Sequence, residues 1–331
     1  MKSTISTLLC GLVLSMAANT SLAAGTPEGQ YIQTITSGIP HSALFGISFD
    51  AGTGVAVGIG GSVLTTGDGG ATWTPVKQDA TELALLAVER RGSHTIAVGQ
   101  LGVAIIETAP GQWKKADTGV EGRLLSVSVN SSGLAVAGGE FGLVIKSTDG
   151  GQTWAQAAPV WTDYADPDQP GTAEPHIYSV HVSERGDITV AGEFGVILRQ
   201  DAGSDQWRVL NPLKAGTPTL FAMHLSDSPL GNSYAVGQAG EVLISTNGGD
   251  SWFRNRAKTQ SNFLGVTSAP GGKVVITGMR VMMRSGNGGI DWSPIEEGDT
   301  TTDWYQAVRT ERGSGRIMAV GHAGRIIQIK G

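Results

Sequence analysis

The chain has 331 residues, with 49 glycines, 13 prolines and a charged fraction of 16%. This glycine-rich, weakly charged composition fits many short strands joined by tight turns, and it argues against a long helical protein. The formal net charge of −6, from 29 acidic and 23 basic residues, argues against general nucleic-acid binding.

Residues 1–23 have the composition of a cleavable signal peptide. Lys2 gives a positive start, residues 8–16 form an apolar run too short to span a bilayer, and residues 21–23 form a small-x-small cleavage site. Cys10 would be the lipidated residue of a lipoprotein, but the residue before it is not small. Cleavage after Ala23 removes this cysteine, and an exported chain without cysteine fits a bacterial periplasm. We therefore predict a periplasmic mature protein that does not insert into the membrane.

The mature chain repeats one pattern about every forty residues. Each repeat has an apolar stretch, a turn that opens with glycine, a second apolar stretch and, in six of the seven repeats, a tryptophan 14 or 15 residues after that glycine. The first turn glycines are Gly58, Gly99, Gly139, Gly192, Gly237, Gly278 and Gly321. The tryptophans are Trp73, Trp113, Trp154, Trp207, Trp252 and Trp292.

Seven repeats of this kind predict an all-β fold, a seven-bladed β-propeller in which residues 24–331 form one domain. The last repeat stops after its third strand, 326–329, with no room for a fourth. Residues 31–35 read as an orphan strand ahead of the first repeat. We therefore expect the ring to be closed by the N-terminal strand completing the last blade, which protects the sheet edges.

Four turns match, or nearly match, the Asp-box (BNR) pattern Ser/Thr-x-Asp-x-Gly-x-Thr-Trp. The carboxylate of such a turn can accept backbone N–H bonds, the glycines permit positive φ, and the tryptophan packs on the sheet. We assign these turns a structural role. Their key residues are Asp68, Trp73, Asp149, Trp154, Asn247, Trp252, Asn287 and Trp292, with asparagine replacing the aspartate in the last two boxes.

One connection between repeats is about a dozen residues longer than the others. It spans residues 158–176 and holds four prolines, four acidic residues and two aromatic residues, Trp161 and Tyr164. Blade topology places it on the face of the glycine turns, opposite the Asp boxes. Since aromatic side chains among polar residues are typical of binding hot spots, we expect Trp161 and Tyr164 to be exposed anchors for a partner.

The residue after the first turn glycine is expected near the mouth of a central channel. Along the chain these residues are Ile59, Gln100, Glu140, Glu193, Gln238, Met279 and His322. One interpretation is a polar recognition rim, in which Glu140 and Glu193 accept a cation or a basic peptide; the other is that turns are polar because they meet water. No ligand spacing indicates a metal site, and we predict none. The predicted partner-binding residues are Gln100, Glu140, Trp161, Tyr164, Glu193, Gln238, Arg280 and His322.

The seven repeats, the Ala-Val-Gly-x-x-Gly core and the Asp boxes together resemble the propeller family of the photosystem II stability and assembly factor, with its non-photosynthetic bacterial relatives. Residues 140–147 and 238–245 are the most typical segments, and the resemblance covers the whole mature chain. It implies a non-catalytic scaffold that holds membrane-protein partners during assembly, in non-photosynthetic bacteria often beside transporters of the resistance-nodulation-division type. Photosynthetic members carry an arginine-rich patch, whereas this chain is acidic and concentrates arginine late. We therefore expect the scaffold role, in a monomer, but not the photosystem as partner.

Asp boxes also occur in sialidases and related glycosidases, so a glycoside hydrolase or a glycan-binding lectin is the alternative function. Sialidase chemistry needs three arginines around a substrate carboxylate, a tyrosine nucleophile and an acid/base carboxylate. Arg280 lies inside a glycine turn and Arg325 directly follows one, but other arginines fall near the Asp boxes on the opposite face. Because no convergent triad is visible, we predict no catalytic residue and no cofactor.

Overall fold

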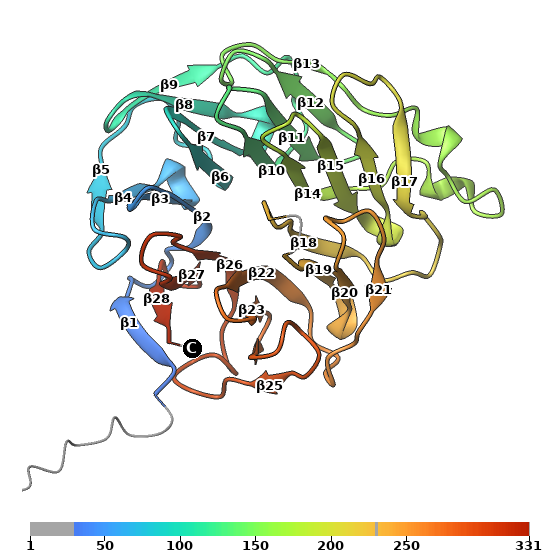
Figure 1. Cartoon of the computed structure of the whole chain (residues 1–331). Helices are drawn as coiled ribbons and strands as arrows, with labels where there is room; N and C mark the ends of the chain where they lie inside the picture. The colour runs from blue at the N-terminus through green and yellow to red at the C-terminus, as the bar shows by residue number, and fades with distance from the viewer. Residues whose placement is uncertain (1–29, 229–230, 331) are drawn as a thin grey trace, which may run out of the picture. The chain divides into compact units, whose positions relative to one another are not determined.

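The structure is a computed structural model that describes residues 30–228 and 231–330. The chain divides into two units, Met1–Gln30 and Tyr31–Gly331, and the predicted signal peptide lies outside the described residues. The second unit consists of seven four-stranded antiparallel sheets arranged around a central axis (Figure 1). This arrangement confirms the predicted seven-bladed β-propeller.

The first four blades follow the chain from the innermost to the outermost strand. Blade 1 comprises β2 (Leu44–Asp50), β3 (Thr53–Gly58), β4 (Val63–Thr66) and β5 (Thr74–Val76). Blade 2 comprises β6 (Leu85–Arg91), β7 (His94–Gly99), β8 (Ala104–Ala109) and β9 (Gln112–Ala116). Blade 3 comprises β10 (Leu124–Val129), β11 (Ala135–Gly139), β12 (Val144–Ser147) and β13 (Ala155–Gln156). Blade 4 comprises β14 (Ile177–Val182), β15 (Ile188–Gly192), β16 (Ile197–Gln200) and β17 (Trp207–Asn211).

The remaining blades continue this order until the last one, which takes a strand from the N-terminus. Blade 5 comprises β18 (Leu220–His224), β19 (Ser233–Gly237), β20 (Val242–Ser245) and β21 (Phe253–Arg254). Blade 6 comprises β22 (Phe263–Ala269), β23 (Lys273–Gly278), β24 (Met282–Ser285) and β25 (Ser293–Pro294). Blade 7 comprises β26 (Tyr305–Thr310), β27 (Ile317–Gly321), β28 (Ile326–Ile329) and β1 (Ile32–Thr36). Short 3-10 turns are η1 (Ile59–Gly61), η2 (Gln100–Gly102), η3 (Trp161–Asp163), η4 (Pro170–Thr172), η5 (Glu193–Gly195) and η6 (Gln238–Gly240).

The hydrophobic core lies between neighbouring sheets. The second strands β11, β15, β19 and β27 are buried at every position, because adjacent blades cover both faces of each sheet. One cluster joins Val98 of blade 2 to Leu124 of blade 3, and another joins Val275 of blade 6 to Tyr305 of blade 7. Each aliphatic side chain buried in this way contributes about 1.5–3 kcal/mol. The ring is therefore held together mainly by packing between blades.

Each innermost strand carries a β-bulge at its second residue. In blade 1, Leu44 pairs with Gly58 and Gly46 with Val57, so that Phe45 is bypassed. The same shift occurs in all seven blades. Because a bulge redirects a side chain, the bypassed residues face the central channel. They are Phe45, Leu86, Leu125, Tyr178, Phe221, Leu264 and Gln306.

The N-terminal strand closes the ring, as predicted. β1 pairs antiparallel with β28, with Ile32 opposite Ile329, so the strand order in blade 7 is β1-β28-β27-β26. Glu297, which precedes blade 7, accepts hydrogen bonds from the backbone N–H groups of Tyr31 at 2.7 Å and Ile32 at 3.1 Å. The N–H of Lys330 donates to the carbonyl of Tyr31 at 2.7 Å. A side chain of the preceding connection thus fixes the strand that completes the blade.

Candidate functional site

Each glycine turn brings two backbone segments into close contact at the mouth of the channel. In blade 3, the N–H of Glu140 donates to the carbonyl of Arg123, which directly precedes the innermost strand, at 3.1 Å. A Cβ added to Gly139 would lie 2.2 Å from that carbonyl oxygen. The equivalent Gly237 has φ −171°, an extended conformation open to any residue. The first turn glycine is therefore required by close backbone approach.

The side chains of Glu140 and Glu193 complete this contact. The Glu140 carboxylate accepts hydrogen bonds from the N–H of Arg123 at 3.2 Å and from its guanidinium at 2.5 Å. The hydrogen bond from this guanidinium lowers the pKa of Glu140. Glu193 accepts from the N–H of His176 at 2.8 Å and faces its Nδ1 at 2.9 Å. Each carboxylate is thus engaged within its own blade, which gives both residues a part in holding the turn.

The other polar turn residues also lie at the mouth of the channel. Gln100 and Gln238 are exposed, and each accepts a bond from the backbone N–H that precedes its innermost strand, at 3.2 and 3.5 Å. The His322 side chain is 46% exposed, with its Nδ1 3.2 Å from the carboxylate of Asp303. Arg280 is exposed with φ 55°, and its N–H donates to the carbonyl of Asp303. These four residues share one face of the ring with Glu140 and Glu193.

The aromatic residues of the insertion are not the exposed anchors that we predicted. Trp161 is only 8% exposed, and its indole N–H donates to the carbonyl of Gly142 at 2.7 Å. A Cβ on Gly142 would lie 2.3 Å from the indole nitrogen, so the ring occupies the space above this glycine. Tyr164 is half-buried, and its hydroxyl donates to the carbonyl of Trp207 at 3.1 Å. The prediction is wrong because the insertion folds back and covers its own aromatic side chains.

Exposed apolar side chains instead occupy the third position of the glycine turns. Leu101 and Phe141 are 68% and 67% exposed, with φ of 51° and 52°. A bulky residue in this left-handed region costs about 1–2 kcal/mol, and exposed side chains bury little apolar area to offset that cost. Phe194 has φ 56° at the same position and packs partly against its own blade. In blade 1 the third position is Gly60, and the exposed apolar residue is Ile59 at the second position, with 44% exposure. We call these residues of blades 1–4 the turn-face arc (Ile59, Leu101, Phe141 and Phe194).

The Asp boxes form closed hydrogen-bonded turns on the opposite face. In blade 3 the Asp149 carboxylate accepts from the Ser147 hydroxyl at 2.7 Å, the Thr153 N–H at 3.0 Å and the Thr153 hydroxyl at 2.6 Å. These bonds, led by the one from the Thr153 hydroxyl, lower the pKa of Asp149 to about 2. The matching bonds in blade 1 lower the pKa of Asp68 below its usual range. The Trp154 indole N–H donates to a carbonyl of its own turn at 2.9 Å.

The boxes with asparagine keep this geometry because donor and acceptor change places between the first and the last polar residue of the turn. Asn247 accepts the N–H of Ser251 at 3.0 Å through its amide oxygen, and its amide nitrogen donates to the Ser251 hydroxyl at 2.9 Å. Asn287 likewise donates to the carboxylate of Asp291 at 2.9 Å. In the Asp boxes the direction is reversed, because the threonine hydroxyl four residues later donates to the aspartate carboxylate. The asparagine boxes are therefore intact turns.

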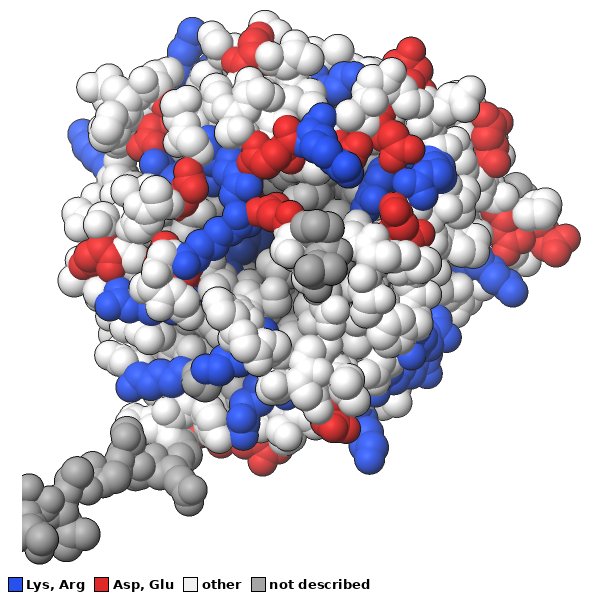
Figure 2. Space-filling view, in the orientation of Figure 1, with Lys and Arg blue, Asp and Glu red and all other residues white. Residues whose placement is uncertain are grey.

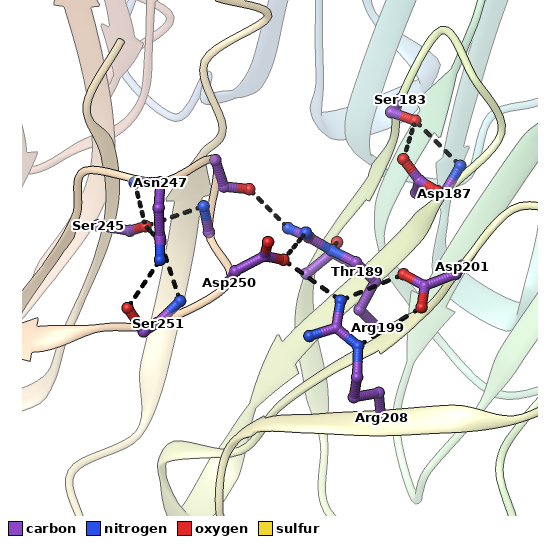
Figure 3. A network of polar contacts seen from close by, with 12 residues as sticks. Ser183, Asp187, Thr189, Arg199, Asp201, Arg208, Ser245, Asn247, Asp250 and Ser251 are labelled. Atoms are coloured by element: carbon purple, nitrogen blue, oxygen red, sulfur yellow. Dashed lines mark hydrogen bonds and ion pairs between the residues drawn. The ribbon is translucent and has the colours of Figure 1, made fainter. Parts of the chain in front are cut away.

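An Asp-box turn also bonds to the blade before it, as Figure 3 shows for blades 4 and 5. Arg199 of β16 is 7% exposed, and its guanidinium donates to the Asp250 carboxylate at 2.7 Å and to the Gly248 carbonyl at 2.8 Å. Its Nε donates to the Thr189 hydroxyl at 3.0 Å, and Arg208 brings a second cation to Asp250 at 3.2 Å. This network is structural, because every charge in it has a partner in an adjoining strand or turn.

The central channel has two compartments. Towards the glycine turns it is a narrow throat of about 80 Å³, lined in part by the bypassed bulge residues. Phe45 stacks on Trp304 with centroids 5.9 Å apart, and Tyr178 meets Phe221 edge-on at 5.0 Å. Towards the Asp boxes the channel widens into a chamber of about 490 Å³. The fifth residues of the innermost strands line this chamber: Ser48, Glu89, Ser128, His181, His224, Thr267 and Arg309.

The chamber places titratable groups in a poorly solvated setting. Burial lowers the pKa of His181 to about 4 and that of His224 to about 3, so both imidazoles are neutral at pH 7. Burial raises the pKa of Glu89, and the charge of Arg309 opposes this rise. The His224 Nε2 lies 2.8 Å from the Ser268 hydroxyl.

Charged side chains of both signs surround the mouth of the chamber, as Figure 2 shows around a central hollow. Arg91 pairs with Glu184 at 2.5 Å and with Asp227 at 3.3 Å. Arg312 also pairs with Asp227. The arginines at this mouth therefore have carboxylate partners from non-adjacent blades, so these ion pairs span the mouth.

The arginines considered for sialidase chemistry do not converge in the described structure. Arg254 and Arg256 both pair with the buried Glu241, at 2.5 and 3.1 Å, and Arg325 pairs with Asp303 at 2.9 Å.

Within residues 30–228 and 231–330, no group of three or more His, Asp or Glu side chains is placed to hold a metal ion. In the same residues, no helix is long and apolar enough to cross a membrane.

The fold and its turns define a class, the seven-bladed β-propellers with Asp-box turns. In sequence, the chain is 26% identical over 188 residues to the photosystem II assembly lipoprotein Ycf48 of Synechococcus sp. (strain CC9902). The aligned part covers 53% of this chain and 51% of that relative, so the chain spans about half the length of the curated relative that it matches. This similarity confirms the resemblance predicted from the repeats. No protein-family model matches the chain.

Solved propellers match over most of the chain. A YCF48 bound to D1 peptide has a TM-score of 0.67 and 18% identity, covering 91% of this chain and 97% of its own. YCF48 from Cyanidioschyzon merolae has a TM-score of 0.68 and 18% identity, covering 90% and 98%. The WD40 propeller domain of Doa1 reaches 0.67 with 12% identity, covering 91% and 97%. Since an assembly factor and a WD40 domain match equally well, the structural likeness shows the fold alone.

Proposed function

We propose that this propeller is a non-catalytic scaffold that binds an extramembrane segment of a membrane protein while the complex of that protein is assembled. The sequence similarity to the Ycf48 assembly lipoprotein supports this function. A similar fold is also found in a YCF48 with a bound D1 peptide. In this proposal the chain is exported by residues 1–23 and acts in the periplasm as a monomer. The partner is a membrane-protein complex such as a transporter of the resistance-nodulation-division type.

The observation that carries this proposal is the turn-face arc. Leu101 and Phe141 are exposed apolar side chains held in the left-handed region, and neither belongs to a hydrophobic core cluster of the described residues. Phe141 lies against the His176 ring, with centroids 4.8 Å apart. Backbone strain of this kind is often found at ligand-binding sites. The neighbouring Arg123–Glu140 and His176–Glu193 pairs supply the polar surroundings that binding hot spots usually have. The arc therefore has the composition of a surface for a peptide with apolar side chains.

The test is capture of the partner from detergent-solubilised membranes with tagged mature protein. The double variant Leu101→Ser/Phe141→Ser removes the apolar surface and leaves the turn backbone unchanged. Ile290→Ser is the matched control, because Ile290 is 70% exposed on an Asp-box turn of the opposite face. We expect the double variant to lose about tenfold or more in capture, in line with removal of hot-spot side chains, and the control to keep it. Equal capture by wild type and double variant would exclude the arc as the docking site.

The location has its own test. Cell fractionation followed by mass spectrometry of the N-terminus should find the mature protein in the periplasmic fraction, beginning at Ala24. A full-length chain in the cytoplasm would refute the periplasmic proposal. That result would leave the docking test on purified protein unaffected.

A further inference from the structure

The chamber on the Asp-box side of the ring is a second candidate site, separate from the turn-face arc. Its volume of about 490 Å³ lies within the range of small-molecule pockets, about 300–1,000 Å³. The throat narrows the channel to a space of about 80 Å³ on the way to the glycine turns. The bulge residues that line this throat are apolar or aromatic in six of the seven blades. The chamber therefore offers polar walls, and apolar or aromatic bulge side chains at its narrow end.

Arg309 distinguishes the chamber from a merely polar channel. It is part of the wall of both compartments, so it stands where the throat opens into the chamber. Its guanidinium donates to the carbonyl of Val308 at 3.1 Å. Among the described residues, no carboxylate lies within 4.0 Å of it, whereas Arg91 at the mouth has two and Arg312 has one. Arg309 therefore forms no direct ion pair within the described structure.

The nearby side chains of the chamber wall are acidic, neutral or already hydrogen-bonded. Two acidic residues, Glu89 and Asp227, lie on the chamber wall. Asp227 pairs with Arg91 and Arg312, while burial raises the pKa of Glu89 and the charge of Arg309 opposes this rise. His181 and His224 are neutral at pH 7, so each presents one N–H donor and one acceptor. The hydroxyls of Ser48 and Thr267 already accept backbone N–H bonds from the adjoining blades. An anion entering the chamber would find a guanidinium and imidazole donors on its walls.

We propose that the chamber binds a small organic carboxylate, with the carboxylate group at Arg309 and a compact apolar group in the throat. A charged hydrogen bond between guanidinium and carboxylate is stronger than a neutral one, and more so away from bulk water. The throat walls, which include Phe45 and Leu264, have the shape and chemistry for a few carbon atoms. His181 and His224 line the same chamber and supply further donors. This site goes beyond the scaffold function, because it lies inside the ring and not on the docking face.

The test is isothermal titration of purified mature protein with three probes. Benzoate carries both the charge and the apolar group, benzamide is its neutral analogue, and phosphate is an anion without an apolar group. We expect saturable benzoate binding with a dissociation constant below about 10 mM, and at least about tenfold weaker binding of the other two. No saturable benzoate binding, or equal binding of benzamide or phosphate, would overturn the proposal.

Variants then locate the site. Arg309→Gln should weaken benzoate binding by about tenfold or more, while Arg185→Gln, whose side chain is 85% exposed, should leave it unchanged. Leu264→Phe adds volume to the throat wall without altering any charge, and it should also weaken benzoate binding. If Arg309→Gln does not fold, Leu264→Phe alone tests whether benzoate binds with its apolar group in the throat. Wild-type affinity in a folded Arg309→Gln, or in Leu264→Phe, would place the ligand elsewhere.

Discussion

A glycine-to-alanine series can separate the two reasons for glycine in this fold. Gly237 has φ −171°, so alanine adds no backbone strain there, but its Cβ would lie 1.8 Å from the carbonyl oxygen of Thr219. That carbonyl accepts the N–H of Gln238 at 2.9 Å and would have to move. A hydrogen bond of this kind contributes about 1 kcal/mol, and overpacking costs about 1–3 kcal/mol. We therefore expect Gly237→Ala to lower the free energy of unfolding by about 2–4 kcal/mol.

Two further variants serve as matched comparisons. Gly203 has φ 77° with no atom within 4 Å of an added Cβ, so Gly203→Ala should cost only the left-handed strain, about 1–2 kcal/mol. Gly67 has open space and no positive φ, so Gly67→Ala should be neutral or stabilise by up to about 1 kcal/mol. Urea unfolding followed by tryptophan fluorescence measures all three. If Gly237→Ala loses no more stability than Gly67→Ala, close backbone approach is not what requires the glycine.

Three other predictions concern closure, packing and pH. Glu297→Ala removes both hydrogen bonds to the first strand, so limited proteolysis should cut that strand faster; an unchanged cleavage rate would contradict the closure model. Trp161→Ala should cost about 3–5 kcal/mol in urea unfolding, and Trp154→Ala less because Trp154 is only partly buried; a much smaller loss at Trp161 would mean that the insertion opens in solution. Stability should fall as the pH drops from about 6.5 to 4, because the unfolded chain protonates His181 and His224 there while the folded chain keeps them neutral. Melting temperatures across this pH range should vary less in His181→Gln/His224→Gln, and an unaltered slope would show that other groups cause it.

The number of blades and the closure of the ring were predictable because both depend on chain order. The recurrence of the turn glycines counts the blades, and the missing fourth strand after Ile329 indicates where the first strand must pair. The bonds that join the blades were not predictable. Arg316 donates to the carbonyl of Asp68 at 2.8 Å, between residues 248 positions apart, and no local pattern marks such a partner.

The surfaces of the candidate sites were harder to predict than the fold. Trp161 sits among prolines and acidic residues, a composition typical of exposed loops, yet the bare backbone of Gly142 leaves room for its ring. The predicted rim consisted of the residue directly after each turn glycine. The exposed apolar side chains lie one position later, where Leu101 has a positive φ that is uncommon for leucine. The channel lining depends on bulges such as the one at Phe45, and a strand pattern alone would have placed that side chain in the sheet alternation.

The pairing of β1 with β28 has a consequence for the order of folding. The first strand leaves the ribosome long before its neighbour, since Ile32 lies opposite Ile329, about 300 residues later. Joining ends that far apart in an unfolded chain costs about 5 kcal/mol in entropy, so blade 7 is best completed after the other six have shortened the gap. Until then the ring has two unpaired strand edges. A chain truncated before its last strand would keep these unpaired edges. Proteases would then encounter the incomplete protein as an open ring.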